Sequence, residues 1–182
     1  MSILTAKVKK PLNHSNNLFL LDVSQEEKTT KIRMEMLISC VCTSELPMTY
    51  SILKKQLPSI MRSKCFNENN YKFSKEVKNT EIGHLFEHII LEYLSNLKSL
   101  EGVKNPIYNG LTSWNWTKDP RGVFHIEIDS GLDDESALSL ALHKSNQLLY
   151  AILESGQIKL PTYENSKYSN ILPEVVDKKL II

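Results

Sequence analysis

The sequence predicts a single α+β domain, in which a mixed or antiparallel sheet packs two long helices on one face. Two segments have the periodicity of long amphipathic helices, and three have the alternating or continuously apolar pattern of strands. A chain of 182 residues with 41% apolar side chains can bury the core of one domain. No stretch rich in Pro, Gly or Ser divides it, so we expect a domain over residues 1–156 and an extension or tail over 157–182.

The first third of the chain predicts two strands and a short helix. Residues 18–23, LFLLDV, have the composition of a short strand. Residues 31–42, KIRMEMLISCVC, alternate at first and then become continuously apolar, which predicts a strand buried on both faces. Residues 47–57 resemble a short helix with Pro47 near its start, and residues 66–72 predict a polar loop.

The clearest helix prediction runs from about Thr80 to Leu97. Asn79 or Thr80 can cap it, and Glu81 suits its first turn. One broad arc of this helix is apolar and predicts the face that meets the core: Ile82, Phe86, Ile89, Ile90, Tyr93 and Leu97. The opposite side is polar, so we expect its side chains to lie away from the core.

The second half of the chain predicts one more strand and one more long helix. Residues 101–121 are rich in turn-forming residues and predict an irregular connection. Residues 122–129, GVFHIEID, alternate strictly and predict a strand. Asp133 is expected to cap a helix that continues to about Glu154. The residues from Lys159 onward fit an added strand as well as a tail.

Composition excludes several classes of protein. The 22 Lys and Arg residues balance 21 Asp and Glu residues, whereas nucleic-acid binders usually have a basic excess. No apolar run is long enough to span a bilayer, and the first ten residues lack the pattern of a signal peptide. Three cysteines, an odd number, argue against a disulfide framework and for a reducing compartment. We therefore expect a cytoplasmic protein that binds neither nucleic acid nor membrane.

The chemistry is concentrated in the segment Gly83-His84-Leu85-Phe86-Glu87-His88. On a helix, His84 and His88 project from one face, so both imidazoles can reach one ion, and Glu87 lies beside them. Two imidazoles and one acidic ligand suit Zn²⁺, with Glu87 as general base. The pattern H-x-x-E-H is that of the inverted zincins. A polar helix face with two solvated histidines accounts for the same residues equally well.

A third metal ligand must come from another element. Glu135 is the first choice, because it lies in the first turn of the second long helix, and Asp129 and Glu127 are the alternatives on the preceding strand. An acidic residue in a first turn is also explained by the helix dipole alone. Cys40-Val-Cys42 has too short a spacing for a zinc knuckle, so buried strand cysteines explain that pair better.

The segment NTEIGHLFEHIILEYL, residues 79–94, resembles the N-terminal domain of cyanophycin synthetase. The stretch LPSIMRSKC (57–65) and the strand GVFHIEID (122–129) are similar to that domain in the same order, and the resemblance covers about residues 45–156. In that family the domain precedes two ligase modules that build an Asp-Arg polymer, and neither module is expected in these 182 residues. The resemblance places His84, His88 and Glu135 as metal ligands and Glu87 as base.

The resemblance implies a zinc-dependent hydrolase of an amide or peptide bond, of the metallopeptidase type. The motif is shared with pitrilysin-type peptidases and S-ribosylhomocysteine lyase, which carry it on a helix packed against a sheet. Two arginines of the family are missing, because the matching segment here is Gly110-Leu111-Thr112-Ser113. Trp114 and Trp116 follow it and either line a peptide-binding cleft or cover the core.

Three functions are therefore weighed. The first is a Zn²⁺ hydrolase acting on a peptide-like or small amide substrate, and the second is a non-catalytic binding or scaffolding domain with the same fold. The third is a zinc enzyme of the lyase type. Homo-oligomerisation is left open by the sequence.

Overall fold

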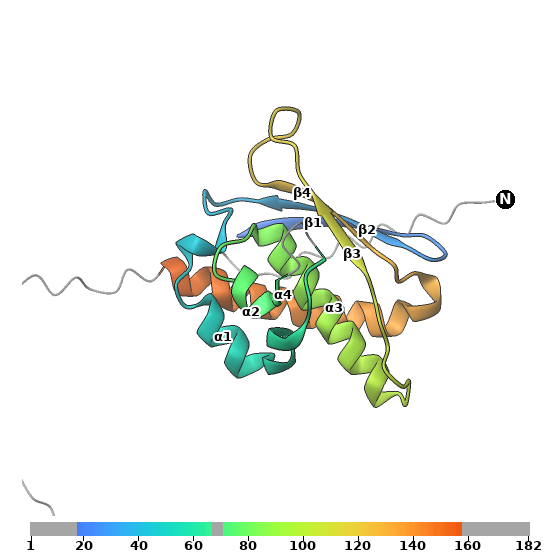
Figure 1. The fold of residues 1–182 in the computed structure, drawn as a ribbon. Helices are drawn as coiled ribbons and strands as arrows, with labels where there is room; N and C mark the ends of the chain where they lie inside the picture. Colours follow the sequence, from blue (N-terminus) through green and yellow to red (C-terminus); the bar gives the residue numbers. More distant parts are fainter. Residues whose placement is uncertain (1–17, 67–70, 158–182) are drawn as a thin grey trace, which may run out of the picture.

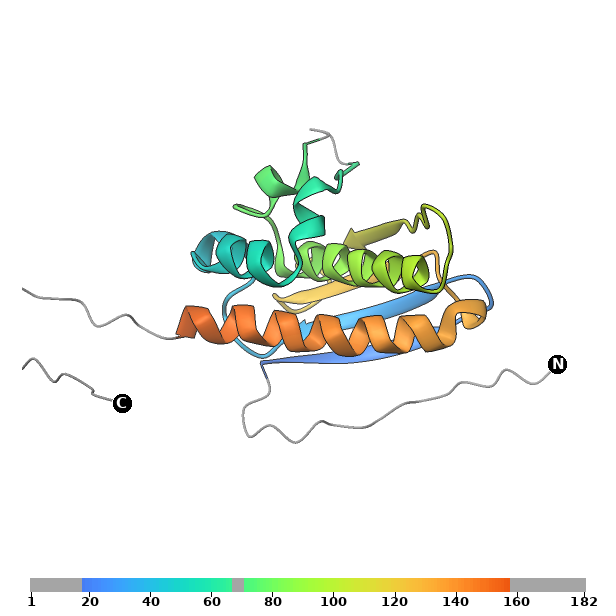
Figure 2. The same ribbon diagram turned by 90° about the horizontal axis from the view of Figure 1, so that it is seen from below.

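The computed structural model describes residues 18–66 and 71–157, which form one sheet covered on one side by helices (Figures 1 and 2). The sheet has the order β1-β2-β4-β3, and every neighbouring pair is antiparallel. Its strands are β1 (Phe19–Gln25), β2 (Thr30–Met36), β3 (Gly110–Ser113) and β4 (Val123–Ile128). The predicted α+β class is thus confirmed, with the sheet purely antiparallel.

Two long helices pack on the buried face of this sheet, as predicted. They are α3 (Ile82–Leu100) and α4 (Glu135–Gln157), and they run side by side in opposite directions in Figure 2. The core between helices and sheet is built from fully buried side chains that include Met34, Phe86 and Phe124. Within the described residues, no helix is long and apolar enough to cross a bilayer.

Three short helical elements lie beside α3, and the last two of them lie on the side of α3 opposite α4 (Figure 2). They are α1 (Thr49–Gln56), the 3₁₀ helix η2 (Pro58–Arg62) and α2 (Phe73–Glu76). Two further 3₁₀ turns are η1 (Thr43–Glu45) and η3 (Leu132–Asp134). Leu53, Ile60 and Phe73 are fully buried, so the three elements are packed onto the domain.

Several predicted boundaries need correction. The predicted strand over 31–42 ends at Met36, and only one of its faces is buried, because the alternate residues Lys31, Arg33 and Glu35 are exposed or half-buried. The apolar residues that follow belong to a connection, in which the carbonyl of Val41 accepts a hydrogen bond from the Ile82 amide at 2.9 Å. The continuous apolar run therefore reflects two different environments, a strand with one buried face and a connection in which Val41 is buried but Leu37 is exposed.

Two smaller differences concern the second half of the chain. The predicted irregular connection over 101–121 contains β3, a strand of four residues that is too short to give a clear alternation. Asp133 lies inside η3, and α4 begins at Glu135, so Asp133 is not the helix cap. Residues 158–182, including the segment after Lys159, lie outside the described part of the chain.

Candidate metal centre

The first two turns of α3 carry the paired histidines. The ring centroids of His84 and His88 are 4.8 Å apart, as expected for residues one helical turn apart. The sequence predicts that this side of the helix lies away from the core, but Glu87 and His88 are only 5% and 7% exposed. The reason is tertiary, because Phe73 of α2 covers the histidine side of α3 and β3 covers the side of Glu87.

A short antiparallel bridge between Lys64 and Lys72 brings a cysteine to the same place. The amide of Cys65 donates to the carbonyl of Tyr71 at 3.1 Å, and the amide of Phe73 donates to the carbonyl of Ser63 at 3.0 Å. Neighbouring residues of an extended segment point to opposite sides. The two lysines therefore point to solvent, and Cys65 and Phe73, at 3% and 0% exposure, point toward α3.

Cys65, His84 and His88 form the one group of three metal-binding side chains found within the described residues. Their ligand atoms all lie within 4.8 Å of one another, and the Sγ of Cys65 is 3.2 Å from Nε2 of His84. With Zn–S near 2.3 Å and Zn–N near 2.0–2.1 Å, tetrahedral coordination requires an S···N distance of about 3.5 Å. The Cys65–His84 pair is therefore within a few tenths of an ångström of the separation that a tetrahedral zinc site needs.

Burial keeps both imidazoles in the neutral form that a metal requires. It lowers the pKa of His88 to about 3, with a smaller contribution from the neighbouring His84, and it also lowers the pKa of His84. The ring of Phe73 stacks on His88 with 4.0 Å between centroids and closes the site from that side. Because metals bind the unprotonated imidazole, these rings are ready to coordinate at neutral pH.

Thr80 orients the ring of His84 through a contact with Nδ1. Its Oγ1 lies 2.7 Å from Nδ1 of His84, which leaves Nε2 facing Cys65. The sequence predicts Thr80 as a possible helix cap, but Glu81 occupies the cap position and no side chain caps the helix. Thr80 is itself fixed by Thr43, through an amide-to-hydroxyl bond of 2.9 Å and an amide-to-carbonyl bond of 2.8 Å. Such outer contacts fix the tautomer of a metal-binding histidine.

Glu87 lies against the edge strand β3. The hydroxyl of Thr112 donates to its carboxylate at 2.5 Å, and Gly110 leaves the space that its carboxyl group occupies. Burial raises the pKa of Glu87 to about 7, and the bond from Thr112 partly opposes this rise. The carboxyl group thus joins α3 to β3 and is poised to exchange a proton near neutral pH.

The structure does not bring Glu135 together with the histidines. Its neighbour Asp134 forms an ion pair with Lys98 at 3.0 Å. Lys98 follows His84 by fourteen residues on α3, which corresponds to about 21 Å along the helix axis. Glu127 lies on the exposed face of β4, and Asp129 accepts hydrogen bonds from Asn109. None of the three acidic residues belongs to the group that contains His84 and His88.

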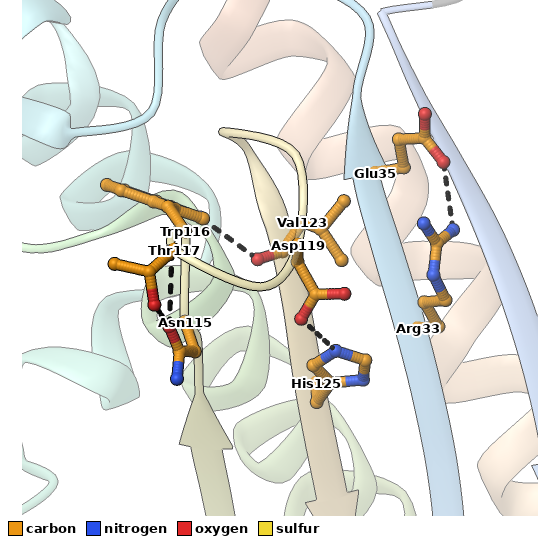
Figure 3. A network of polar contacts seen from close by, with 8 residues as sticks. All are labelled: Arg33, Glu35, Asn115, Trp116, Thr117, Asp119, Val123 and His125. Atoms are coloured by element: carbon orange, nitrogen blue, oxygen red, sulfur yellow. Dashed lines mark hydrogen bonds and ion pairs between the residues drawn. The ribbon is translucent and has the colours of Figure 1, made fainter.

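The open face of the sheet carries a separate set of polar contacts (Figure 3). Asp119 contacts His125 at 3.0 Å, and Arg33 contacts Glu35 at 2.8 Å, all on the side away from the helices. Trp116 packs against the core and donates to the carbonyl of Val123 at 3.1 Å, so it covers the core. The contacts of Asp119 and Trp116 hold the loop between β3 and β4 against β4, and none of these residues belongs to the metal group.

Cys65 is the member of this group that the sequence analysis does not identify. The sequence shows that Cys65 ends the stretch LPSIMRSKC, but it does not show that the bridge near residue 72 turns this side chain toward α3.

A family model described as the cyanophycin synthase-like N-terminal domain matches residues 31–152. A search of curated proteins finds no match. The matched range includes the two histidines, Glu87 and Cys65.

Proposed function

The chain belongs to the cyanophycin synthase-like N-terminal domain family, and on this basis we propose that it is a non-catalytic binding domain stabilised by a zinc ion held by Cys65, His84 and His88. The observation that carries the proposal is the convergence of three ligand atoms within 4.8 Å. One thiol and two neutral imidazoles form a donor set that zinc prefers.

The position of the three ligands supports a structural role for the ion. His84 and His88 belong to α3, whereas Cys65 belongs to the bridged segment that connects η2 with α2. An ion between them would cross-link these short elements to the central helix. Cys65 and His88 are almost fully buried, which fits a closed structural site better than an open catalytic one. In this proposal Cys65 takes the place that the sequence analysis gives to Glu135.

A second candidate function, a zinc-dependent amide or peptide hydrolase, is favoured by one observation. Glu87 is buried next to His88 in the chain and its pKa is raised to about 7, which suits a general base at neutral pH. Zinc would supply Lewis acidity at a carbonyl oxygen. In this reaction the Glu87 carboxylate would accept the proton of the attacking water and pass it to the leaving amine. To do so, Glu87 must give up its bond with Thr112.

Metal analysis tests the zinc site directly. Protein purified without a histidine tag and without added metal is expected to contain close to one zinc ion per chain. His84→Ala and His88→Ala each remove a ligand, so both variants should lose most of it. His143→Ala is the matched control, because His143 is exposed on α4 and lies outside the group. Full zinc content in both α3 variants would contradict the site.

Replacement of Glu87 separates the binding role from the hydrolase. Glu87→Gln retains the shape of the side chain but cannot accept a proton at neutral pH. Because Glu87 does not belong to the metal group, the variant is expected to keep its zinc. If the domain is only a binding module, zinc-loaded wild-type protein should release no amine from a library of peptide amides. A hydrolase would instead show turnover that Glu87→Gln lowers by roughly 10²–10⁴-fold with zinc content unchanged.

A further inference from the structure

The three short helical elements beside α3 carry a concentrated positive charge. Residues 54–78 contain seven Lys and Arg residues against two Glu residues, a net charge of +5 in a chain whose total is only +1. All seven cations are exposed: Lys54, Lys55, Arg62, Lys64, Lys72, Lys75 and Lys78. We call the surface formed by the described residues of this stretch the basic lobe, and the ribbon of this stretch can be followed in Figure 2. The remaining residues of the chain are acidic as a whole.

Two of these cations are held directly opposite each other. The hydrogen bonds on either side of the Lys64–Lys72 bridge make the two residues a non-hydrogen-bonded pair of an antiparallel ladder. Side chains approach most closely in such pairs, and like charges placed there repel. The bridge therefore keeps an unfavourable charge pair on its outer side while it turns Cys65 inward.

The cations of the basic lobe form no ion pair with the part of the chain that the structure describes. Five ion pairs form elsewhere in the same part of the chain. Lys75 lies 3.3 Å from the ring centre of Tyr71, and Lys78 lies 5.8 Å from that of Tyr50. Cation–π contacts place the ammonium groups without removing their charge. The lobe thus remains a positive surface facing solvent.

We propose that the basic lobe binds an acidic segment of a partner polypeptide, with carboxylates bound between Lys64, Lys72 and Lys75. Carboxylates on such a segment would relieve the repulsion between the paired lysines. A polypeptide fits better than a nucleic acid, because a nucleic acid continues beyond the lobe with regularly spaced phosphates and would meet the acidic remainder of the chain. This partner belongs to the binding role proposed above, but the surface contains none of the metal ligands.

Lys72→Glu is the variant that tests the proposal. The new carboxylate would face Lys64 across the bridge, so the repulsive pair becomes attractive and the variant should fold at least as stably as wild type. Binding of a short fluorescent poly-L-glutamate peptide, measured by anisotropy at low ionic strength, should weaken by roughly tenfold. Lys104→Glu is the matched control, because Lys104 is exposed outside the lobe and changes the net charge equally. Wild-type binding should disappear near 1 M salt, where the Debye length is about 3 Å.

Three results would overturn the proposal. If wild-type protein fails to bind the peptide at low ionic strength, the basic lobe is not a binding surface for acidic polypeptides. If Lys72→Glu and Lys104→Glu weaken peptide binding equally, the effect comes from net charge alone. Tighter binding of single-stranded oligothymidylate than of poly-L-glutamate at equal charge would assign the lobe to nucleic acid instead. Zinc content is measured in the same samples. If wild-type protein purified without added metal contains no zinc and still binds the peptide, the metal site is contradicted but the basic lobe is not.

Discussion

Cys65→Ser is expected to remove zinc from the protein, whereas Glu135→Ala is expected to leave the zinc content unchanged. Serine retains the size of the side chain but replaces a soft thiolate by a hydroxyl, which is a poor zinc ligand. The loss of a direct ligand should weaken binding by more than the roughly 10–100-fold that loss of an outer contact costs. Metal analysis and competition with a chromophoric chelator measure both quantities.

Two comparisons make this result specific. Cys42→Ser is the matched control, because Cys42 contacts Ser44 and Asn79 and does not belong to the metal group. Zinc that binds only the native state stabilises it by about 4 kcal/mol at a free concentration a thousandfold above Kd. A chelator should therefore lower the melting temperature of wild-type protein and of Cys42→Ser, but not that of Cys65→Ser. If Glu135→Ala loses its zinc and Cys65→Ser keeps it, Glu135 is the third ligand, as the sequence predicts.

The two long helices and the strands could be predicted because their periodicity is a local property of the chain. The alternation of residues 122–129 predicts β4 to within one residue at each end, and the apolar arc from Ile82 to Leu97 predicts α3. The local sequence pattern does not predict the structure where tertiary packing determines it. Strand β3 has only four residues, too few to show a clear alternation. The apolar segment over residues 31–42 changes from strand to loop after Met36 without a change in hydropathy.

The metal group could be predicted only in part, for the same reason. His84 and His88 are one turn apart on one helix, so their proximity follows from the sequence alone. Cys65 reaches them through the bridge between residues 64 and 72, a contact that no periodicity reveals. The start of the second long helix and the family resemblance predict Glu135 as the third ligand, but the sequence does not show that α3 and α4 run in opposite directions. That orientation puts the start of α4 near Lys98, far from the histidines.

Gly83→Ala is expected to destabilise the domain by about 1–3 kcal/mol, because the added methyl group has no space. A Cβ at Gly83 would lie 2.4 Å from Cγ of Phe124 and 2.7 Å from its Cβ. The phenyl ring cannot move away easily, since it is fully buried and makes edge contacts with Trp114 and Trp116. Alanine gains about 1 kcal/mol over glycine within a helix, so the crowding must exceed that gain. Chemical denaturation measures the net change.

Gly156→Ala in α4 is the control for the helix propensity. Its Cβ would approach Cδ2 of Leu46 at 2.2 Å, but that atom ends a flexible side chain and the next atom is 3.6 Å away. We expect this variant to lose less stability than Gly83→Ala. Phe124→Ala removes two of the three crowding atoms, Cγ and Cδ1, so a double variant that combines it with Gly83→Ala should lose less than the sum of the two single changes. Gly83 directly precedes His84, so a displaced α3 should also weaken zinc binding. A Gly83→Ala protein as stable as wild type would show that α3 is not held against β4 by this contact.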